Sequence, residues 1–273
     1  MITFYVDGGK KNGMGHIYRS INLALILKKK IKTNFLIPGK KTYNEKKILI
    51  NIFKKFNLKL KFINKNLDAQ FQNNGGKCII FDHPKIDIRT IKIAKKKFIK
   101  TILIDDENSL NSYETNMIIN QNAYATKLNY KIKNNKLKKL FGSNYTILKS
   151  RPDKKIKIKK DLKNILLIFG GTDVKNYYNK IVRKIPNFKL IIMANNKIIL
   201  SKILKIKKIP NVEIINSNNI FQVIKSKKID LAISCCGTTL YDLFSFGIPV
   251  MGMLCAKNQG NAYNFYSKNK AII

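Results

Sequence analysis

Apolar runs of strand length alternate with longer amphipathic stretches along this chain, and this alternation limits the possible fold more than any other feature. The apolar runs predict strands at Ile2–Val6, Cys78–Phe81, Thr101–Ile104, Met117–Ile119, Ile165–Phe169, Leu190–Met193, Val212–Ile215, Leu231–Ser234 and Val250–Leu254. Amphipathic stretches such as Ile17–Leu27 and Ile88–Phe98 predict helices. Strands that alternate with helices form parallel sheets with right-handed crossovers, so the pattern predicts an α/β fold.

The alternation is interrupted near the middle of the chain. Residues 150–153 (Ser-Arg-Pro-Asp) are a turn signal, and a lysine-rich polar run follows before the alternation restarts at Ile165. A length of 273 residues is enough for two domains that each bury a core. We therefore predict two Rossmann-like domains, residues 1–150 and residues 151–273.

The formal net charge of +39 is the kind of charge that nucleic-acid-binding proteins carry. However, only four of the 54 basic residues are arginine, which base-reading surfaces favour, and the lysines are spread over the whole chain. A solvated lysine surface is therefore the interpretation we adopt, with no nucleic-acid partner, and nucleic-acid binding is the alternative. A positive field would also steer a dianionic small molecule towards the protein.

Targeting signals and cysteines give a prediction of location. No stretch reaches the roughly 18 apolar residues of a membrane-spanning helix, and the first residues lack the basic segment that begins a signal peptide. Cys78, Cys235, Cys236 and Cys255 lie in apolar runs without the paired spacing of metal ligands. These features predict a cytoplasmic protein without membrane insertion, whose buried cysteines are free thiols.

The ends of the predicted strands carry the information about function, because ligands of parallel α/β sheets bind beyond the carboxyl ends of the strands. Asp7 follows the first strand, and a loop with Gly13 and Gly15 then leads into a helix that begins near His16. Glycines let a ligand approach the backbone, and a helix N-terminus attracts anions. His16 is the candidate general base, with Arg19 on the same helix face and Asp7 as a possible partner that orients the imidazole. The alternative is a structural loop with a capping histidine.

Two further strand ends carry polar residues. Asp82 and His83 follow the strand at Cys78–Phe81 and should face the same edge of the sheet, although a structural aspartate beside a surface histidine is an equal alternative. Residues 105–107 (Asp-Asp-Glu) could suggest a divalent metal, but adjacent acids in a turn rarely all point at one ion. We predict that they cap the turn, and that the protein has no metal site and no cofactor.

The second half of the chain repeats the order of strand end, glycine and helix start. The candidates there offer backbone N–H groups, hydroxyls, a carboxylate or side-chain amides for phosphate and ribose groups: Gly170, Gly171, Thr172, Gly237, Thr238, Thr239, Asp242, Asn258 and Gln259. The alternative for the segment around Gly237 is an ordinary capped helix and turn.

Taken in order, these residues resemble a known family, the UDP-2,4-diacetamido-2,4,6-trideoxy-β-L-altropyranose hydrolases of pseudaminic acid biosynthesis. That family is close to the spore-coat-polysaccharide and MurG-like nucleotide-sugar proteins. The resemblance runs nearly from end to end and rests on residues 13–19, 82–83, 105–106, 120–124, 141–149, 170–173, 242 and 258–259. Pro84 stands where family members usually have tyrosine, so the identity of the sugar is left open.

The resemblance implies a glycosyltransferase-B-like fold and an enzyme that binds a UDP-sugar between its domains. It implies a hydrolase that releases UDP from a 2,4-diacetamido-2,4,6-trideoxy-hexose by attack of water at the anomeric carbon, with His16 as the catalytic residue. The implied sugar-binding residues are Asp7, Gly13, Gly15, Arg19, Asp82 and His83, and the candidates of the second half would bind UDP. A UDP-sugar-dependent glycosyltransferase of surface polysaccharide synthesis and a catalytically silent nucleotide-sugar-binding protein are the alternatives, and the oligomeric state is open.

Overall fold

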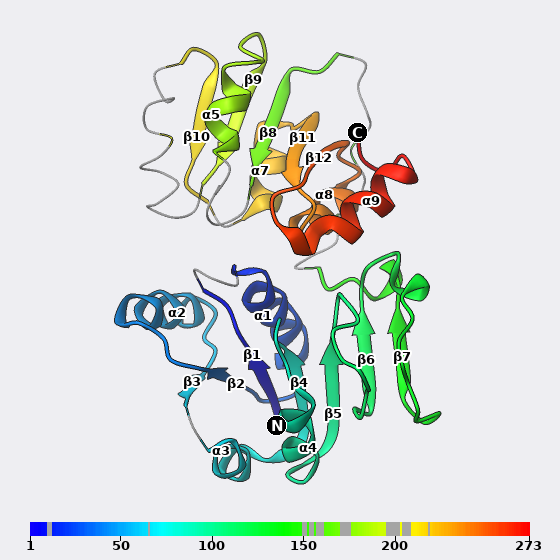
Figure 1. The fold of residues 1–273 in the computed structure, drawn as a ribbon. Helices are drawn as coiled ribbons and strands as arrows, with labels where there is room; N and C mark the ends of the chain where they lie inside the picture. The colour runs from blue at the N-terminus through cyan, green and yellow to red at the C-terminus, as the bar shows by residue number, and fades with distance from the viewer. Residues whose placement is uncertain are drawn as a thin grey trace. The chain divides into compact units, whose positions relative to one another are not determined.

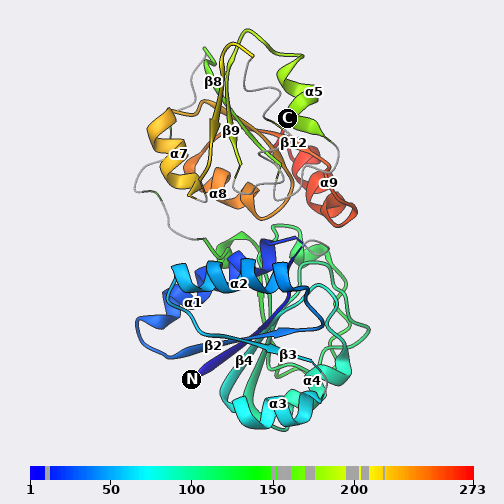
Figure 2. The ribbon, with the colours of Figure 1, turned by 90° about the vertical axis from the view of Figure 1, so that its left-hand side faces the viewer.

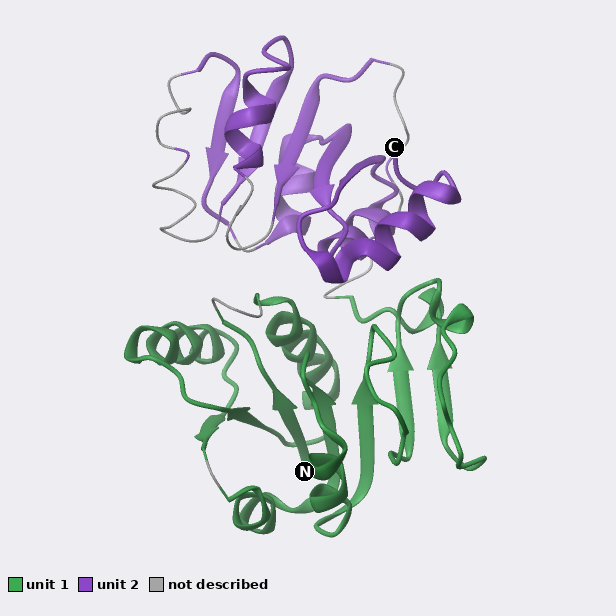
Figure 3. Cartoon of the chain, in the orientation of Figure 1, with its two compact units in different colours: residues 1–149 green, residues 150–273 purple. Residues whose placement is uncertain are grey.

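The computed structural model describes residues 1–9, 13–64, 66–148, 152, 156, 161–169, 176–194, 203, 209–217 and 219–273. The chain divides into two compact units, Met1–Lys149 and Ser150–Ile273, which Figure 3 shows in different colours. Each unit is built on one parallel sheet with helices on its faces.

Unit 1 is an α/β layer structure with a seven-stranded sheet in the order β3-β2-β1-β4-β5-β6-β7 (Figure 1). The strands are β1 (Ile2–Val6), β2 (Thr33–Pro38), β3 (Leu60–Ile63), β4 (Gly76–Asp82), β5 (Phe98–Ile104), β6 (Met117–Asn120) and β7 (Lys138–Phe141). The helices are α1 (Gly15–Lys28), α2 (Tyr43–Lys55), α3 (Leu67–Asn74) and α4 (Ile88–Lys95), with short 3₁₀ turns η1 (Ala125–Lys127) and η2 (Ser143–Tyr145). All the strand pairs are parallel.

Side-chain alternation along the strands divides the core of unit 1 between the two faces of the sheet. On β1, Phe4 and Val6 point to the face covered by α1 and α2, whereas Tyr5 points to the face covered by α3 and α4 (Figure 2). Phe4 stacks on Phe35 of β2 with ring centroids 4.7 Å apart. Phe53 of α2 packs edge-on against the Phe35 ring. Both faces are therefore packed, which is why the strands are apolar throughout.

The described residues of unit 2 form a five-stranded sheet in the order β10-β9-β8-β11-β12. Its strands are β8 (Asn164–Ile168), β9 (Lys189–Met193), β10 (Val212–Ile215), β11 (Leu231–Cys235) and β12 (Val250–Met253), and all pairs are parallel. Its helices are α5 (Tyr177–Val182), α7 (Ile220–Lys227), α8 (Thr239–Phe246) and α9 (Gly260–Lys268), with the 3₁₀ turn η4 (Lys257–Gln259).

The strand order of each sheet reverses at one place. In unit 1 the strands β1, β2 and β3 extend to one side and β4 begins the other side, so the reversal lies between β1 and β4. In unit 2 it lies between β8 and β11. The connections leave such neighbouring strands in opposite directions, which opens a crevice at their carboxyl ends where ligands of open α/β sheets bind.

The strands and the helix Ile17–Leu27 that the sequence predicts are present, with ends that differ by a few residues. The helix predicted to reach Phe98 ends at Lys95, because Phe98 is the first residue of β5 and packs its ring against Phe71. The expectation of four free thiols is wrong, because a disulfide joins Cys235 to Cys255. Among the described residues, no helix combines the length and apolar character that crossing a membrane requires.

Replacing Phe35 with alanine is expected to lower the free energy of unfolding by about 3–5 kcal/mol, because the ring is fully buried between two other rings. Urea denaturation followed by circular dichroism measures this. Ile99→Ala is the matched control, since Ile99 is also on a strand of unit 1 but is 73% exposed, and its loss should stay below about 1 kcal/mol. Equal losses in the two variants would contradict the packing described for the face under α1 and α2.

Candidate functional site

Asp82 lies at the centre of the candidate site, at the carboxyl end of β4. Ile80 of the same strand packs on the face covered by α1 and α2, and Asp82, two residues later, points to that face as well. The register pairs Asp82 with Val6 of β1, so the carboxylate lies at the reversal of strand order. Its exposed fraction is 0%, so its charge must be compensated by protein groups.

Three residues on one face of α1 supply that compensation. Arg19 donates from Nε to Oδ2 at 3.0 Å and from Nη2 to Oδ1 at 2.6 Å. Ser20 donates its hydroxyl to Oδ2 at 2.9 Å. His16 Nδ1 lies 2.7 Å from Oδ1. Residues three and four apart on a helix are neighbours, so His16, Arg19 and Ser20 can reach one carboxylate together.

Arg19 connects this carboxylate to a second one on the neighbouring strand end. Its Nη1 donates to both oxygens of Asp106, at 2.9 and 2.7 Å. Asn122 donates from Nδ2 to Asp106 Oδ1 at 3.3 Å and to Asn120 Oδ1 at 2.7 Å. The guanidinium is thereby held between the ends of β4 and β5, and only 3% of Arg19 is exposed.

The charges of this cluster stabilise one another. Burial alone would raise the pKa of Asp82, but the attraction and hydrogen bonds of Arg19 and His16 outweigh it and hold the pKa well below its usual range. For Arg19, burial acts against the charged form, and Asp106 and Asp82 more than offset it, so its pKa is raised. Asp82 is therefore ionised and Arg19 charged throughout the physiological pH range.

The ionised Asp82 fixes the tautomer of His16. A carboxylate can only accept a hydrogen bond, so Nδ1 of His16 carries the hydrogen of the 2.7 Å contact. Arg19 Nη2 lies 3.3 Å from the same nitrogen, but it too is only a donor and makes no hydrogen bond there in this tautomer. The lone pair of a neutral His16 is therefore on Nε2, and the side chain is 20% exposed. Such a nitrogen can accept a proton from a ligand.

A second pair of predicted residues lies on the other side of the sheet. Asp7 and His83 follow β1 and β4 with the same side-chain direction as Tyr5, whose ring is 5.6 Å from the His83 ring. Asp7 Oδ1 accepts from Gly8 N–H at 2.8 Å and forms an ion pair with Lys41, while its Oδ2 is 3.8 Å from His83 Nε2. The prediction that Asp7 orients His16 is thus wrong: Asp82 does so, because alternation directs Asp7 away from that face.

His83 is a neutral hydrogen-bond donor at physiological pH. Burial lowers its pKa, as do electrostatic interactions with His16 and Lys41, against the opposing influence of Asp7 and Asp82. Its Nδ1 accepts from Lys85 N–H at 3.0 Å, so its hydrogen is on Nε2. Lys41, which follows β2, belongs with Asp7 and His83 and was not predicted from the sequence. The turn signal Pro38-Gly39 after an apolar run could have indicated it.

The acids at the end of β5 behave as turn and network residues. Asp105 accepts from Glu107 N–H at 3.1 Å, from Ser109 N–H at 3.0 Å and from Tyr113 hydroxyl at 2.6 Å. Asp106 forms a salt bridge with Arg19. These bonds agree with the capping predicted from the sequence. Among the described residues, no group of three or more His, Cys, Asp or Glu side chains is arranged to hold a metal ion.

The glycine loop lies beside the start of α1. Gly9 donates its N–H to Gly13 carbonyl oxygen at 2.8 Å, and Gly13 has a φ of +70°, which favours glycine. The N-cap residue Met14 makes no side-chain bond to the helix, and Gly15 is the first helical residue. Gly13 and Gly15 therefore place only backbone atoms, and no side chain of their own, at the start of α1 next to His16.

In unit 2 the described candidates lie at the carboxyl ends of β11 and β12. Gly237, Thr238 and Thr239 lead into α8, and Asp242 is in its first turn. Asn258 and Gln259 belong to η4. A Cβ placed on Gly237 would lie 3.5 Å from Gln259 Nε2, so Gln259 reaches the segment that starts α8. The predicted residues Gly170, Gly171 and Thr172 lie outside the described residues.

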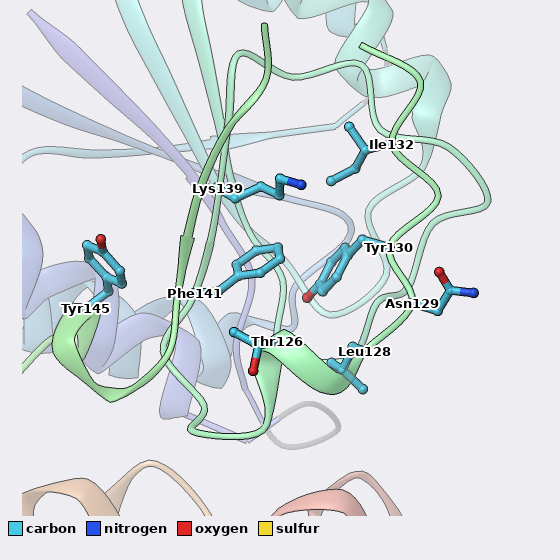
Figure 4. Close-up of a pocket in the computed structure, with 8 residues that line it drawn as sticks. All are labelled: Thr126, Leu128, Asn129, Tyr130, Ile132, Lys139, Phe141 and Tyr145. Carbon is cyan, nitrogen blue, oxygen red and sulfur yellow. The ribbon is translucent and has the colours of Figure 1, made fainter. Parts of the chain in front are cut away.

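A separate hollow of about 470 Å³ lies beside β7 in unit 1 (Figure 4). Its lining includes Tyr130 and Phe141, whose ring centroids are 4.6 Å apart, and the side chain of Lys139. Tyr130 hydroxyl donates to Asp105 carbonyl oxygen at 2.8 Å and accepts from Asn120 at 2.8 Å. The hollow was not anticipated from the sequence, and its lining includes none of the predicted site residues.

No family model matches the sequence. An uncharacterized protein of Methanocaldococcus jannaschii is 27% identical over 294 residues, which cover 98% of this chain and 58% of that protein. The chain thus spans less than two thirds of the length of this relative.

Solved structures resemble the chain over nearly its whole length. MurG of Acinetobacter baumannii has a TM-score of 0.59 at 12% identity, covering 98% of this chain and 83% of MurG. UGT2 of Phytolacca americana, complexed with UDP-2fluoro-glucose and pterostilbene, has a TM-score of 0.57 at 12% identity. The match covers 100% of this chain and 84% of UGT2. A candidate UDP-N-acetylglucosamine 2-epimerase of Listeria monocytogenes has a TM-score of 0.54 at 12% identity. The match covers 99% of this chain and 88% of the epimerase.

At these identities the likeness establishes the fold. The chain has an α/β fold of two parallel-sheet domains, the glycosyltransferase-B fold that the sequence resemblance implied. Function has to be argued from the side chains at the sheet edges, because one fold supports many activities.

Asp82→Asn is expected to lower the free energy of unfolding at pH 7 by about 3–5 kcal/mol, because it leaves Arg19 with one buried charged partner fewer. The folded-state pKa of Asp82 is lowered, so its contribution is complete above the unfolded pKa of about 3.9 and is lost as the pH falls below it. The difference between variant and wild type should therefore shrink at pH 3.

Urea denaturation at the two pH values measures this difference. Asp68→Asn is the control, since the same chemical change is made at a unit 1 carboxylate whose side chain is 60% exposed, and its effect should stay below about 1 kcal/mol. If Asp82→Asn were no more destabilising than Asp68→Asn at pH 7, the assignment of Asp82 as an ionised anchor would be wrong.

Proposed function

We propose that this protein is a UDP-sugar hydrolase in which unit 1 binds the reacting end of the sugar and unit 2 binds UDP. The observation that carries the proposal is the His16–Asp82 pair at the reversal of strand order in unit 1. It combines an oriented imidazole with its lone pair on Nε2, a partly exposed side chain and a neighbouring helix terminus, which are the parts that general-base catalysis on an anionic substrate requires.

His16 would act as the general base. Nε2 accepts a proton from water as the water oxygen forms a bond to the anomeric carbon, and the bond from that carbon to the diphosphate oxygen breaks. Asp82 stabilises the imidazolium that forms, because its carboxylate already accepts from Nδ1. The imidazolium then releases the proton to solvent. The products are the free sugar, UDP and one proton.

UDP is a good leaving group, so the reaction needs no strong general acid. The segment 237–239 offers the start of α8, where the N-cap Thr238 makes no side-chain bond to the helix, and Thr238 itself is exposed. Helix N-termini stabilise the negative charge that develops on a leaving diphosphate. Asp242, in the first turn, would accept from ribose hydroxyls. Gly170, Gly171 and Thr172 are proposed for the diphosphate from sequence alone.

The sugar would be held by residues around His16. Asp7 and His83 present a carboxylate and a neutral N–H donor, the pair that a sugar hydroxyl or acetamido group can bridge. Gly13 and Gly15 leave room for the sugar near the backbone, and Arg19 holds Asp82 and Asp106 in position. The sequence resemblance supports a 2,4-diacetamido-2,4,6-trideoxy-hexose as this sugar. The same resemblance supports a step in pseudaminic-type acid biosynthesis.

A glycosyltransferase is the second candidate, and one observation favours it. The hollow beside β7 is lined by aromatic rings, which bind the apolar faces of sugars and other organic acceptors, and unit 1 also carries His16. A transferase releases UDP only when an acceptor is present. Rapid UDP release from a UDP-sugar in buffer alone, unchanged by added acceptors, would exclude this candidate.

His16→Ala is expected to reduce turnover by about 10²–10⁴-fold, the usual loss when a general base is removed. UDP affinity should stay within error of wild type, because the residues proposed for UDP belong to unit 2. UDP release measures turnover, and calorimetry measures affinity and serves as the internal control for folding. A variant with near-normal turnover would show that His16 is not the base.

Asp242→Ala is expected to weaken UDP binding by roughly 1–3 kcal/mol, the range for loss of a hydrogen bond to a charged group. Glu213→Ala is the matched control: it also removes a carboxylate from unit 2, but from β10, where Glu213 pairs with Lys189 and Lys227. Calorimetry with UDP should give unchanged affinity for this control. Equal affinities in the two variants would remove Asp242 from the nucleotide site.

A further inference from the structure

The disulfide between Cys235 and Cys255 links the segments that follow two neighbouring strands. Cys235 is the last residue of β11 and pairs in register with Met253, the last residue of β12. Cys255 follows two residues later, which brings the two Cα atoms to 5.6 Å and allows the bond. The cross-link therefore lies at the carboxyl edge of the sheet in unit 2.

Both linked segments carry residues that the sequence resemblance assigns to UDP, and the proposed function places UDP in this unit. The segment 237–239 begins two residues after Cys235, and Asn258 and Gln259 follow Cys255 closely. Gln259 Oε1 accepts from Cys255 N–H at 3.0 Å, and its Nε2 faces Gly237. The disulfide and the Gln259 side chain thus hold these two segments at a fixed separation.

The remaining cysteines are poor competitors for this bond. Cys236 is buried, and burial raises the pKa of its thiol to about 11, so little thiolate is present at neutral pH. Thiol–disulfide exchange requires the thiolate. Cys78 is on β4 in unit 1. Cys255 is partly exposed, so a reductant can reach the bond from the side of Cys255.

We propose that the Cys235–Cys255 disulfide is a redox-sensitive element that sets the affinity of unit 2 for UDP; this rests on the proposed function. A dithiol reductant attacks Cys255 Sγ, the disulfide breaks, and Cys235 leaves as a thiolate. The second thiol of the reductant then displaces Cys255 and closes the reductant's own disulfide. Two electrons pass to the protein, and both cysteines end as thiols.

The pairing of β11 with β12 from Ala232 to Cys235 and the hydrogen bond from Cys236 N–H to Met253 do not involve the two sulfur atoms, so we expect reduction to leave the sheet intact. Reduction frees the segment that begins at Cys255, which then has to be ordered again when UDP binds. Ordering a few side chains on binding weakens affinity by about tenfold. The oxidised protein is therefore the form that binds UDP more tightly.

Calorimetry with UDP, on oxidised protein and on protein reduced with dithiothreitol, tests the proposal. Mass spectrometry after alkylation reports which cysteines are linked in each sample. We expect about tenfold weaker binding after reduction and recovery on reoxidation. Cys235→Ser/Cys255→Ser should bind weakly under both conditions, while Cys78→Ser should respond like wild type. Thermal unfolding of each sample checks that the change in affinity is measured on folded protein.

Equal UDP affinity of the oxidised and reduced forms would overturn the redox proposal and leave the proposed nucleotide site standing. Free thiols at Cys235 and Cys255 in the oxidised sample would overturn it as well. Absence of UDP binding in both forms would instead contradict the proposed function, and the redox proposal with it.

Discussion

The buried carboxylate of Asp82 is the constraint on which the arrangement of unit 1's candidate site depends. A charge without solvent must be met by several donors, and α1 supplies them from His16, Arg19 and Ser20. The same bonds fix the position of α1 against β4 and the tautomer of His16. Because Arg19 also binds Asp106, the end of β5 is tied to the same point. One ion cluster thus sets both the local structure and the protonation pattern.

Strand alternation separates the polar residues at this edge into two groups. Asp82 points to the side of α1, and Asp7 and His83 point to the side of Tyr5. The first group has an imidazole nitrogen available to accept a proton, while the second offers a carboxylate and an N–H for binding. Both groups lie where β1 and β4 diverge, which is the place where an open parallel sheet can receive a ligand.

The sequence predicted the α/β class, because apolar runs and amphipathic stretches are local patterns that the backbone follows directly. It also singled out His16, Arg19 and Asp82, which the structure brings together, because each stands near a strand end or a helix start. It failed where a contact depends on register. Asp7 was predicted as the partner of His16, and Asp82 was not considered for that role, because the local sequence does not display which strand end lies under α1 in the paired sheet.

Other features depend on elements or contacts far apart in the chain. Lys41 was missed because the strand Thr33–Pro38 was not recognised, and the disulfide was missed because Cys235 and Cys255 are 20 residues apart and meet only through the pairing of β11 with β12. The hollow beside β7 draws its lining from separate segments of unit 1, so no single stretch of sequence indicates it.

The measurement that tests the account most directly is the fate of isotope when a UDP-sugar is turned over in ¹⁸O-labelled water without an acceptor. Attack of water at the anomeric carbon, with His16 as the base, places the label in the released sugar and leaves UDP unlabelled. Label in the phosphate of UDP would mean attack at phosphorus, and no release at all without an acceptor would mean a transferase or a catalytically silent binding protein. Either result would contradict the hydrolase proposed here.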